Sequence, residues 1–207
     1  MMELKDTVVI NHVSFNLDEL EKDCWSRLVN GAIKSRDAFH TPCVGTIVNG
    51  EVSMRTVVLR KALPIQKILR FHTDIRSNKW KELALNHSIS VLFYDASARI
   101  QLRVKGKAIL HFNDDITLEA WQKTSLSSRR CYLTPCPPSS FSDIPTSGLS
   151  ENIEQENFTL EESEYGQQHF GIVAIQVESI DWLWLNHAGH RRAYFDYKSG
   201  NHRWMVP

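Results

Sequence analysis

Arg99-Ile-Gln-Leu-Arg-Val-Lys-Gly-Lys-Ala-Ile-Leu110 is the stretch that decides the fold. Apolar side chains at positions 100, 102 and 104 alternate with polar ones at positions 101, 103 and 105. A period of two is typical of a strand that buries one face and exposes the other. We therefore predict a strand over residues 99–112, with Gln101 on its polar face.

Similar strand patterns flank this segment on both sides. We expect further strands at 41–49, 53–63, 68–73, 88–94, 170–185, 191–197 and 202–206. Asn49-Gly50 is a strong hairpin signal, because both residue types tolerate the positive φ angles of a tight turn. Pro64 marks the end of the strand before it.

Helical spacing appears in three places. Apolar residues recur at helical intervals over 17–37, where Asn16 can cap the start. A second helix is expected from a cap at Asp74 or Ser77 to about Leu85, and a third over 114–128. Residues 133–150 are rich in Pro, Ser and Thr and predict a loop. The acidic run 151–164 is either a solvated helix or a mobile excursion.

These elements predict a mainly β protein with packed helices and one domain over residues 1–207. Within it, we assign 1–40 to an N-terminal helical segment and 133–168 to a loop with an acidic excursion. Many strands with short connections and no alternating βαβ pattern favour an antiparallel barrel. No GxGxxG, GxxxxGK[ST] or HExxH motif is present in the sequence.

The composition argues against several classes of protein. The 24 Lys and Arg residues balance 24 Asp and Glu residues, so the chain lacks the basic excess of a nucleic-acid or membrane-surface binder. The four cysteines form no CxxC pair, which suggests reduced thiols. The N-terminus does not resemble a signal peptide, and no apolar run reaches about 20 residues. We therefore expect a cytoplasmic protein without nucleic-acid or membrane partners.

Arg55-Thr-Val-Val-Leu-Arg60 is the first candidate for chemistry. Arginine at both ends of an apolar strand is costly unless it is paired, and its fork of donors suits a phosphate or carboxylate. Two edge arginines reaching solvent would explain the same pattern.

Phe71-His-Thr-Asp-Ile-Arg-Ser-Asn-Lys79 is the second candidate. Here a strand runs into a helix start, where hydroxyls, positive charge and free N–H groups together suit an anion. Ordinary capping of the helix by Asp74 or Ser77 is the alternative.

Two further candidates follow. Gln101 can donate and accept hydrogen bonds at once, which fits the edge of a heteroaromatic ring, although simple exposure would also explain it. In Asp181-Trp-Leu-Trp-Leu-Asn-His-Ala-Gly-His-Arg-Arg192, aromatic and basic groups together suit a flat anionic ligand. His187 and His190 lack a further ligand for a metal, so we predict no metal site.

Taken in order, these segments resemble the pyridoxamine 5'-phosphate oxidase-like family of FMN-binding split barrels. The resemblance covers about residues 41–207. It is carried by the motifs at 55–60, 71–74, 77–79, 100–106, 128–132, 180–182 and 190–192. It implies a split barrel of about six antiparallel strands and a homodimer with FMN at the subunit interface.

The resemblance also implies particular FMN contacts. The residues that match the family's cofactor site are Arg55, Thr56, Val57, Val58, Leu59, Arg60, His72, Thr73, Ser77, Asn78, Lys79, Gln101, Trp184 and Arg192. Of these, Arg55, Ser77 and Lys79 match phosphate ligands, whereas Gln101 and Arg192 match contacts to the flavin ring. Trp182 is the alternative to Trp184.

Several positions depart from the family pattern. His72 stands in place of a more usual Tyr, and Asn78 in place of an Arg whose contact Arg76 could supply. The substrate-phosphate pattern of the true oxidases is not matched at 121–132, and Gly189-His190 replaces the core of their Arg-x-His motif.

The leading hypothesis is an FMN-dependent oxidoreductase of unknown small-molecule substrate, with His187, His190 and Arg191 as expected substrate contacts. A genuine pyridoxamine or pyridoxine 5'-phosphate oxidase using O2 is one alternative, in which Arg129 and Arg130 would hold the substrate phosphate. A non-catalytic flavin- or haem-binding protein is the other, with His187 or His190 as the haem ligand.

Overall fold

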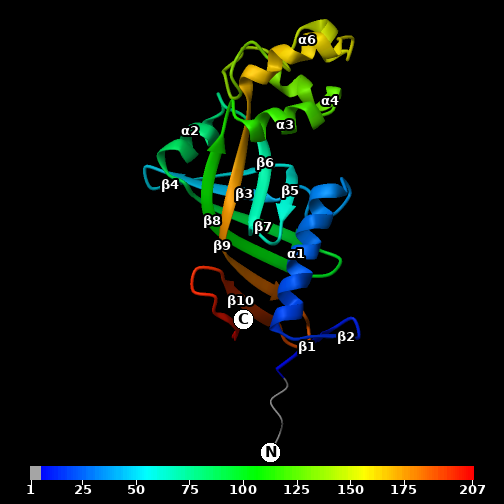
Figure 1. Ribbon diagram of the computed structural model, residues 1–207, viewed down its shortest axis with the longest axis vertical. Helices are drawn as coiled ribbons and strands as arrows, with labels where there is room; N and C mark the ends of the chain where they lie inside the picture. The colour runs from blue at the N-terminus through cyan, green and yellow to red at the C-terminus, as the bar shows by residue number, and fades with distance from the viewer. Residues whose placement is uncertain (1–5) are drawn as a thin grey trace, which may run out of the picture.

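A computed structural model describes residues 6–207 and shows a mainly β protein with helices at its edges (Figure 1). The strands are β1 Val8–Ile10, β2 Val13–Phe15, β3 Cys43–Val48, β4 Glu51–Thr56, β5 Leu59–Leu63, β6 Ile68–Asp74, β7 Ser88–Asp95, β8 Ile100–His111, β9 Phe170–Trp184, β10 Arg191–Asp196 and β11 His202–Met205. The helices are α1 Leu17–Ile33, α2 Asn78–Leu85, α3 Asp115–Lys123, α4 Leu126–Arg129, α5 Glu151–Glu154 and α6 Leu160–Glu164.

Every strand pairing in the described chain is antiparallel, as predicted. The main sheet follows the order β11-β10-β9-β8-β7-β3-β4, while β6 pairs with both β5 and β9. Nine strands therefore form the main sheet, and the expectation of about six is wrong. The long strand β9 runs from the helices at one end of the molecule to β10 at the other (Figure 1).

The predicted strand over 53–63 is wrong, because the chain changes partners in its middle. β4 pairs with β3, whereas β5 pairs with β6. Between them, the Val57 N–H donates to the Pro42 carbonyl at 3.0 Å and the Leu59 N–H to the His40 carbonyl at 2.8 Å. A single straight strand cannot satisfy both sheets, so it breaks at Val57 and Val58.

The helices differ from the prediction mainly at their ends. α1 ends at Ile33 rather than near residue 37, although Asn16 caps it as expected, in a capping box with Glu19. The predicted helix 114–128 breaks after Lys123 into α3 and α4. The hairpin of β1 and β2 was not predicted, and residues 1–5 of the predicted N-terminal segment lie outside the described chain.

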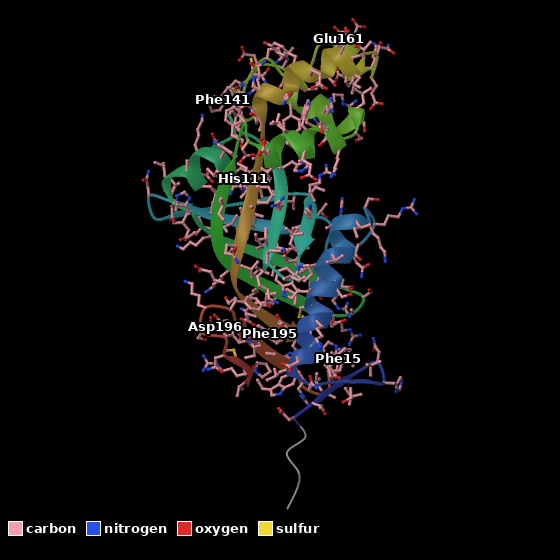
Figure 2. The ribbon with its side chains drawn as sticks, viewed as in Figure 1. Phe15, His111, Phe141, Glu161, Phe195 and Asp196 are labelled. Carbon is pink, nitrogen blue, oxygen red and sulfur yellow. The ribbon has the colours of Figure 1, made fainter. Side chains whose placement is uncertain are left out.

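A helical lobe over residues 115–169 stands at the opposite end of the molecule from β10. Figure 2 shows Phe141 and Glu161 in this lobe, far from Phe195 and Asp196. The acidic segment contains two short helices, α5 and α6, rather than one helix. It is anchored, because the Phe158 side chain is buried and Glu164 accepts a hydrogen bond from Trp121 Nε1 at 2.8 Å.

Two apolar cores hold the structure together. The larger lies inside the barrel and includes Val104, Ile180 and Phe195, and the smaller joins the lobe to β9 through Trp121, Tyr132, Phe170 and Ile172. No helix in the described part of the chain is long and apolar enough to span a membrane.

Candidate functional site

A cluster of hydroxyls and one lysine lies at the start of α2. The Lys79 ammonium donates to Thr73 Oγ1 at 2.9 Å and lies 3.5 Å from Ser77 Oγ, and the two hydroxyls are 3.2 Å apart. Thr73 and Ser77 are almost fully buried. Burial first and then the nearby Arg55 charge lower the pKa of Lys79, against the smaller opposing effects of Asp74 and Glu82. The predicted grouping of these three residues is therefore present in the structure.

The chemistry of this cluster fits a phosphate. The ammonium bonds to neutral hydroxyls rather than to a carboxylate, so an anion would supply the missing opposite charge. Ser77 occupies the cap position of α2, but its side chain makes no capping bond to the first-turn amides. These amides point outward at the positive end of the helix dipole. Asn78 is exposed beside them.

Arg55 lies on β4 and faces α2. Its Nη2 donates to Glu82 Oε2 at 2.7 Å, and its Nη1 donates to Thr46 Oγ1 and to the Ser53 carbonyl. Arg55 is thus close enough to Lys79 to affect its pKa, but a protein carboxylate already holds part of its guanidinium.

Arg76 does not take over the phosphate contact of the family arginine that Asn78 replaces. It forms a salt bridge with Asp74 at 2.7 Å and donates to the Thr134 and Pro135 carbonyls at 3.0 and 3.2 Å. Arg76 instead connects the loop at Thr134 and Pro135 to the end of β6.

His72 and Thr73 point to opposite sides of β6, because neighbouring strand residues alternate. Thr73 joins the hydroxyl cluster, whereas His72 lines a cavity of about 350 Å³ with its ring 4.8 Å from that of Phe170. Burial first, and the charge of Arg60 second, lower the pKa of His72 to about 4, so its imidazole is neutral at pH 7.

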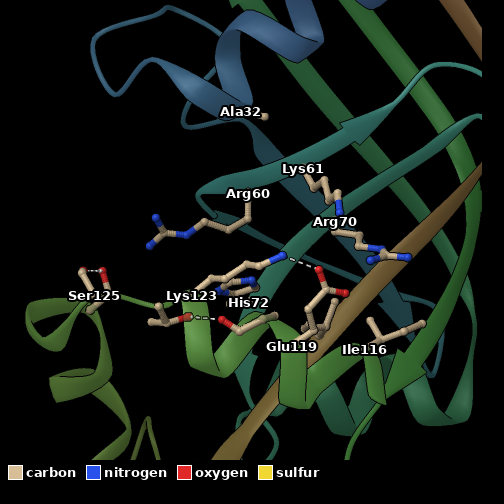
Figure 3. Close-up of a pocket in the computed structure, with 13 residues that line it drawn as sticks. Ala32, Arg60, Lys61, Arg70, His72, Ile116, Glu119, Lys123 and Ser125 are labelled. Carbon is tan, nitrogen blue, oxygen red and sulfur yellow. Dashed lines mark hydrogen bonds and ion pairs between the residues drawn. The ribbon is translucent and has the colours of Figure 1, made fainter. Parts of the chain in front are cut away.

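Basic side chains dominate this cavity (Figure 3). Its walls carry Arg60, Lys61, Arg70 and Lys123, with Glu119 as the carboxylate among the lining residues. Lys123 pairs with Glu119 and so neutralises it. Three cations around the cavity therefore have no lining carboxylate left to balance them.

A β-bulge explains how two consecutive cations reach the same cavity. The register of β5 and β6 shifts between Leu59 and Lys61, which leaves Arg60 as the extra residue. Lys61 then lies directly opposite Arg70, an arrangement of like charges that destabilises a sheet unless an anion lies near. Lys61, Arg70 and Lys123 were not predicted as site residues; the adjacent bases Arg60-Lys61 were the signal available in the sequence.

The predicted ring contacts lie on the exposed face of the sheet. Gln101 is opposite Leu183 in the register of β8 and β9, and Leu183 is opposite Arg192 in that of β9 and β10. Asp181 accepts hydrogen bonds from Arg192 at 2.7 and 3.0 Å and from Arg103 at 2.7 Å.

Neither predicted tryptophan shares that face. Trp182 lies opposite Leu102 and Trp184 opposite Ile100, both of which are buried core residues. Trp182 is fully buried, and Leu183 occupies the place between Gln101 and Arg192. Alternation along the strand therefore separates Trp184 from the two polar residues that were grouped with it.

The remaining predicted residues lie outside these clusters. Thr56 is exposed on β4, Val57 and Val58 form the strand break, and Leu59 is buried in the core. His187, His190 and Arg191 are exposed around the turn between β9 and β10. Within residues 6–207, no group of three or more His, Cys, Asp or Glu side chains is placed to hold a metal ion.

The predicted residues thus fall into two groups at opposite ends of β9. Thr73 is opposite Gly171, while Gln101 is opposite Leu183. The twelve residue steps from position 171 to position 183 correspond to ~40 Å of strand length at the usual rise per residue. The two groups are therefore far apart along this strand.

Comparison with known proteins finds a family model that matches the part of the chain with the hydroxyl cluster. The family model described as pyridoxamine 5'-phosphate oxidase, FMN-binding domain, matches residues 22–112. The match covers a little under half of the 207-residue chain. The hydroxyl cluster, Arg55 and Gln101 all lie within the residues that match this model. A search of curated proteins finds no match.

Solved structures share the fold of the oxidase family beyond the matched segment. One is a pyridoxamine 5'-phosphate oxidase-related, FMN-binding protein from Nostoc punctiforme, with 21% identity and a TM-score of 0.73 over 90% of this chain and 97% of that one. Another is PhzG from Burkholderia lata in complex with tetrahydrophenazine-1-carboxylic acid, with 15% identity and a TM-score of 0.67 over 91% of this chain and 88% of that one. The predicted resemblance and the split-barrel fold are thereby confirmed.

Proposed function

We propose that this protein is an FMN-dependent oxidoreductase that acts on an anionic small molecule as a homodimer. The observation that carries the proposal is the cluster of Lys79, Thr73 and Ser77, inside a domain of an FMN-binding family and without a carboxylate of its own. Bound FMN would supply the redox chemistry, and the side chains would hold and orient it.

The residues of this chain have distinct roles in the proposal. Lys79, Thr73, Ser77 and Arg55 hold the phosphate by charge and hydrogen bonds. Gln101 and Arg192, from a second subunit, contact the polar edge of the ring. No side chain needs to act as a strong acid or base, since the cofactor carries the chemistry.

The dimer is supported by the exposed face of the sheet. Apolar side chains on β3, β4 and β7 share this face with Gln101 and Arg192. They are Ile47 (42% exposed), Val52 (65%), Met54 (64%), Leu92 (36%) and Tyr94 (46%). A contiguous apolar face favours a protein partner. In the proposed dimer, a second copy brings its own Gln101 and Arg192 to the first copy's Lys79, because within one chain these residues lie toward opposite ends of β9.

The basic cavity supports an anionic substrate. Arg60, Lys61 and Arg70 surround a space whose size suits a small ligand, and the Nε atom of Arg70 is buried without a hydrogen-bond partner in the described chain. A carboxylate or phosphate group of the substrate would satisfy these cations, while neutral His72 adds no further positive charge.

The visible absorption spectrum of the purified protein tests the cofactor assignment, with the released cofactor identified by mass. Bound FMN supports the proposal. A colourless protein that also refuses added FMN contradicts it.

Pyridoxamine 5'-phosphate is the first substrate to test, because its phosphate matches the cations of the cavity. Peroxide release from the FMN-loaded protein would favour the genuine oxidase. Arg129 and Arg130 do not support the oxidase hypothesis. Arg129 is buried in the lobe and Arg130 pairs with Glu156 at 2.9 Å, and neither lines the basic cavity.

A further inference from the structure

Glu82 on α2 takes part in a closed triangle of hydrogen bonds with Arg55 and Thr46. Arg55 Nη2 donates to Glu82 Oε2 at 2.7 Å, Thr46 Oγ1 donates to the same oxygen at 2.5 Å, and Arg55 Nη1 donates to Thr46. Thr46 is 1% exposed, and the Arg55 and Glu82 side chains are 22% and 15% exposed. The triangle is therefore shielded from water, which strengthens each of its bonds.

The triangle fixes which edge of the guanidinium remains free. Arginine has five N–H donors in a rigid plane. Both donors of Arg55 Nη1 are used, by Thr46 and the Ser53 carbonyl, and Glu82 takes one from Nη2. The Nε–H and the second Nη2–H have no acceptor among residues 6–207. Two such neighbouring donors are the pair that binds two oxygens of one phosphate.

Charge explains why a carboxylate is needed here. Arg55 and Lys79 are two cations close enough to lower the pKa of Lys79, after the larger effect of its burial. Burial alone would raise the pKa of Glu82, but hydrogen bonds from Thr46 and Arg55 outweigh it, so that Glu82 is ionised at neutral pH. An ionised Glu82 offsets the repulsion between the two cations.

We propose that Glu82 is a positioning residue, which with Thr46 holds the free edge of Arg55 toward the phosphate of a flavin bound at Lys79, Thr73 and Ser77. The inference rests on the proposed FMN site. Glu82 and Thr46 would affect only the phosphate contact and not the contact to the flavin ring.

The affinities of FMN and riboflavin test this role, since the two ligands differ by the phosphate. Both are measured by quenching of flavin fluorescence, and the ratio of the riboflavin Kd to the FMN Kd reports the phosphate contact. We expect Glu82→Gln to lower this ratio about tenfold, the effect of a lost hydrogen bond to a charged group, and to leave riboflavin affinity unchanged. Thr46→Val removes a different corner of the triangle and should lower the ratio in the same direction.

Matched controls make the result specific. Glu51→Gln removes an exposed carboxylate at the start of the same strand as Arg55 and should leave the ratio unchanged. Circular dichroism checks that each variant is folded, and Thr46→Val serves as the test if Glu82→Gln does not fold.

Four results would overturn the proposal. An increase in FMN affinity on Glu82→Gln would mean that Glu82 competes with the phosphate. An equal loss of affinity for both ligands would mean a purely structural role. If the wild type binds FMN and both variants have the same Kd ratio as the wild type, the role of Glu82 is refuted and the proposed function stands. If the wild type does not bind FMN, both are refuted.

Discussion

The guanidinium of Arg129 lies 4.5 Å from the centre of the Trp121 ring. Arg129 is 3% exposed, donates to the Trp121 and Thr124 carbonyls at 2.9 and 3.1 Å, and pairs with Glu164. One buried cation thus joins α3, α4 and α6. This contact ties α6, at the end of the acidic segment, to α3 and α4.

We expect Arg129→Met to destabilise the protein by about 2–4 kcal/mol, because it removes the side-chain hydrogen bonds to the Trp121 and Thr124 carbonyls, the ion pair with Glu164 and the cation beside the Trp121 ring. Urea unfolding monitored by tryptophan fluorescence measures the loss. Arg130→Met is the matched control: its pair with Glu156 is exposed, so its cost should stay below about 1 kcal/mol. Equal effects of the two substitutions would contradict the role of Arg129.

His72 should make the protein sensitive to acid. Its pKa falls from 6.5 in the unfolded chain to about 4 in the folded protein, chiefly through burial. Between these values the unfolded state binds more protons, so stability decreases as the pH falls from about 7 toward 4. The shift corresponds to a loss on the order of 2 kcal/mol once the pH approaches 4.5.

Replacing His72 by Phe removes the titrating group and keeps an aromatic ring beside Phe170. The free energy of unfolding, measured in urea at pH 7 and pH 4.5, should fall less in His72→Phe than in the wild type. A wild type and a variant with the same pH dependence would show that other groups cause the acid sensitivity.

Lys79 should contribute strongly to FMN affinity. Lys79→Met removes the ammonium from the hydroxyl cluster, and we expect the Kd for FMN to rise between about tenfold and a hundredfold, as for a lost charge-assisted contact. Lys81→Met, on the exposed side of the same helix, should have little effect. If Lys79→Met and Arg55→Ala both leave FMN affinity unchanged, the phosphate-site assignment is wrong.

Met54 lies on the apolar face assigned to the subunit contact. Met54→Glu places a charge in that contact and should convert the dimer to a monomer, with loss of FMN binding, as measured by light scattering and flavin fluorescence. Ile65→Glu is the control, because Ile65 is 91% exposed on the turn between β5 and β6, away from this face. A wild-type protein that is monomeric and still binds FMN would contradict the shared site.

The sequence by itself determined the parts of the fold that depend on local pattern. Alternation predicted β8, the Asn49-Gly50 turn joined β3 to β4, and Asn16 capped α1. The segment that holds Thr73, Ser77 and Lys79 was recognised as hydroxyls and positive charge at a helix start, and the family resemblance then assigned it to a phosphate. Local geometry and short-range hydrogen bonds fix such features.

Only the tertiary structure decided the features that depend on strand partners. The break at Val57 and Val58 arises because β4 and β5 pair with different strands. The bulge that points Arg60 and Lys61 toward the same cavity depends on the pairing of β5 with β6. Likewise, the face of the sheet on which Trp184 lies follows from its position opposite Ile100 in the register of β8 and β9. Register and partner choice result from contacts between residues far apart in the chain, which no local pattern contains.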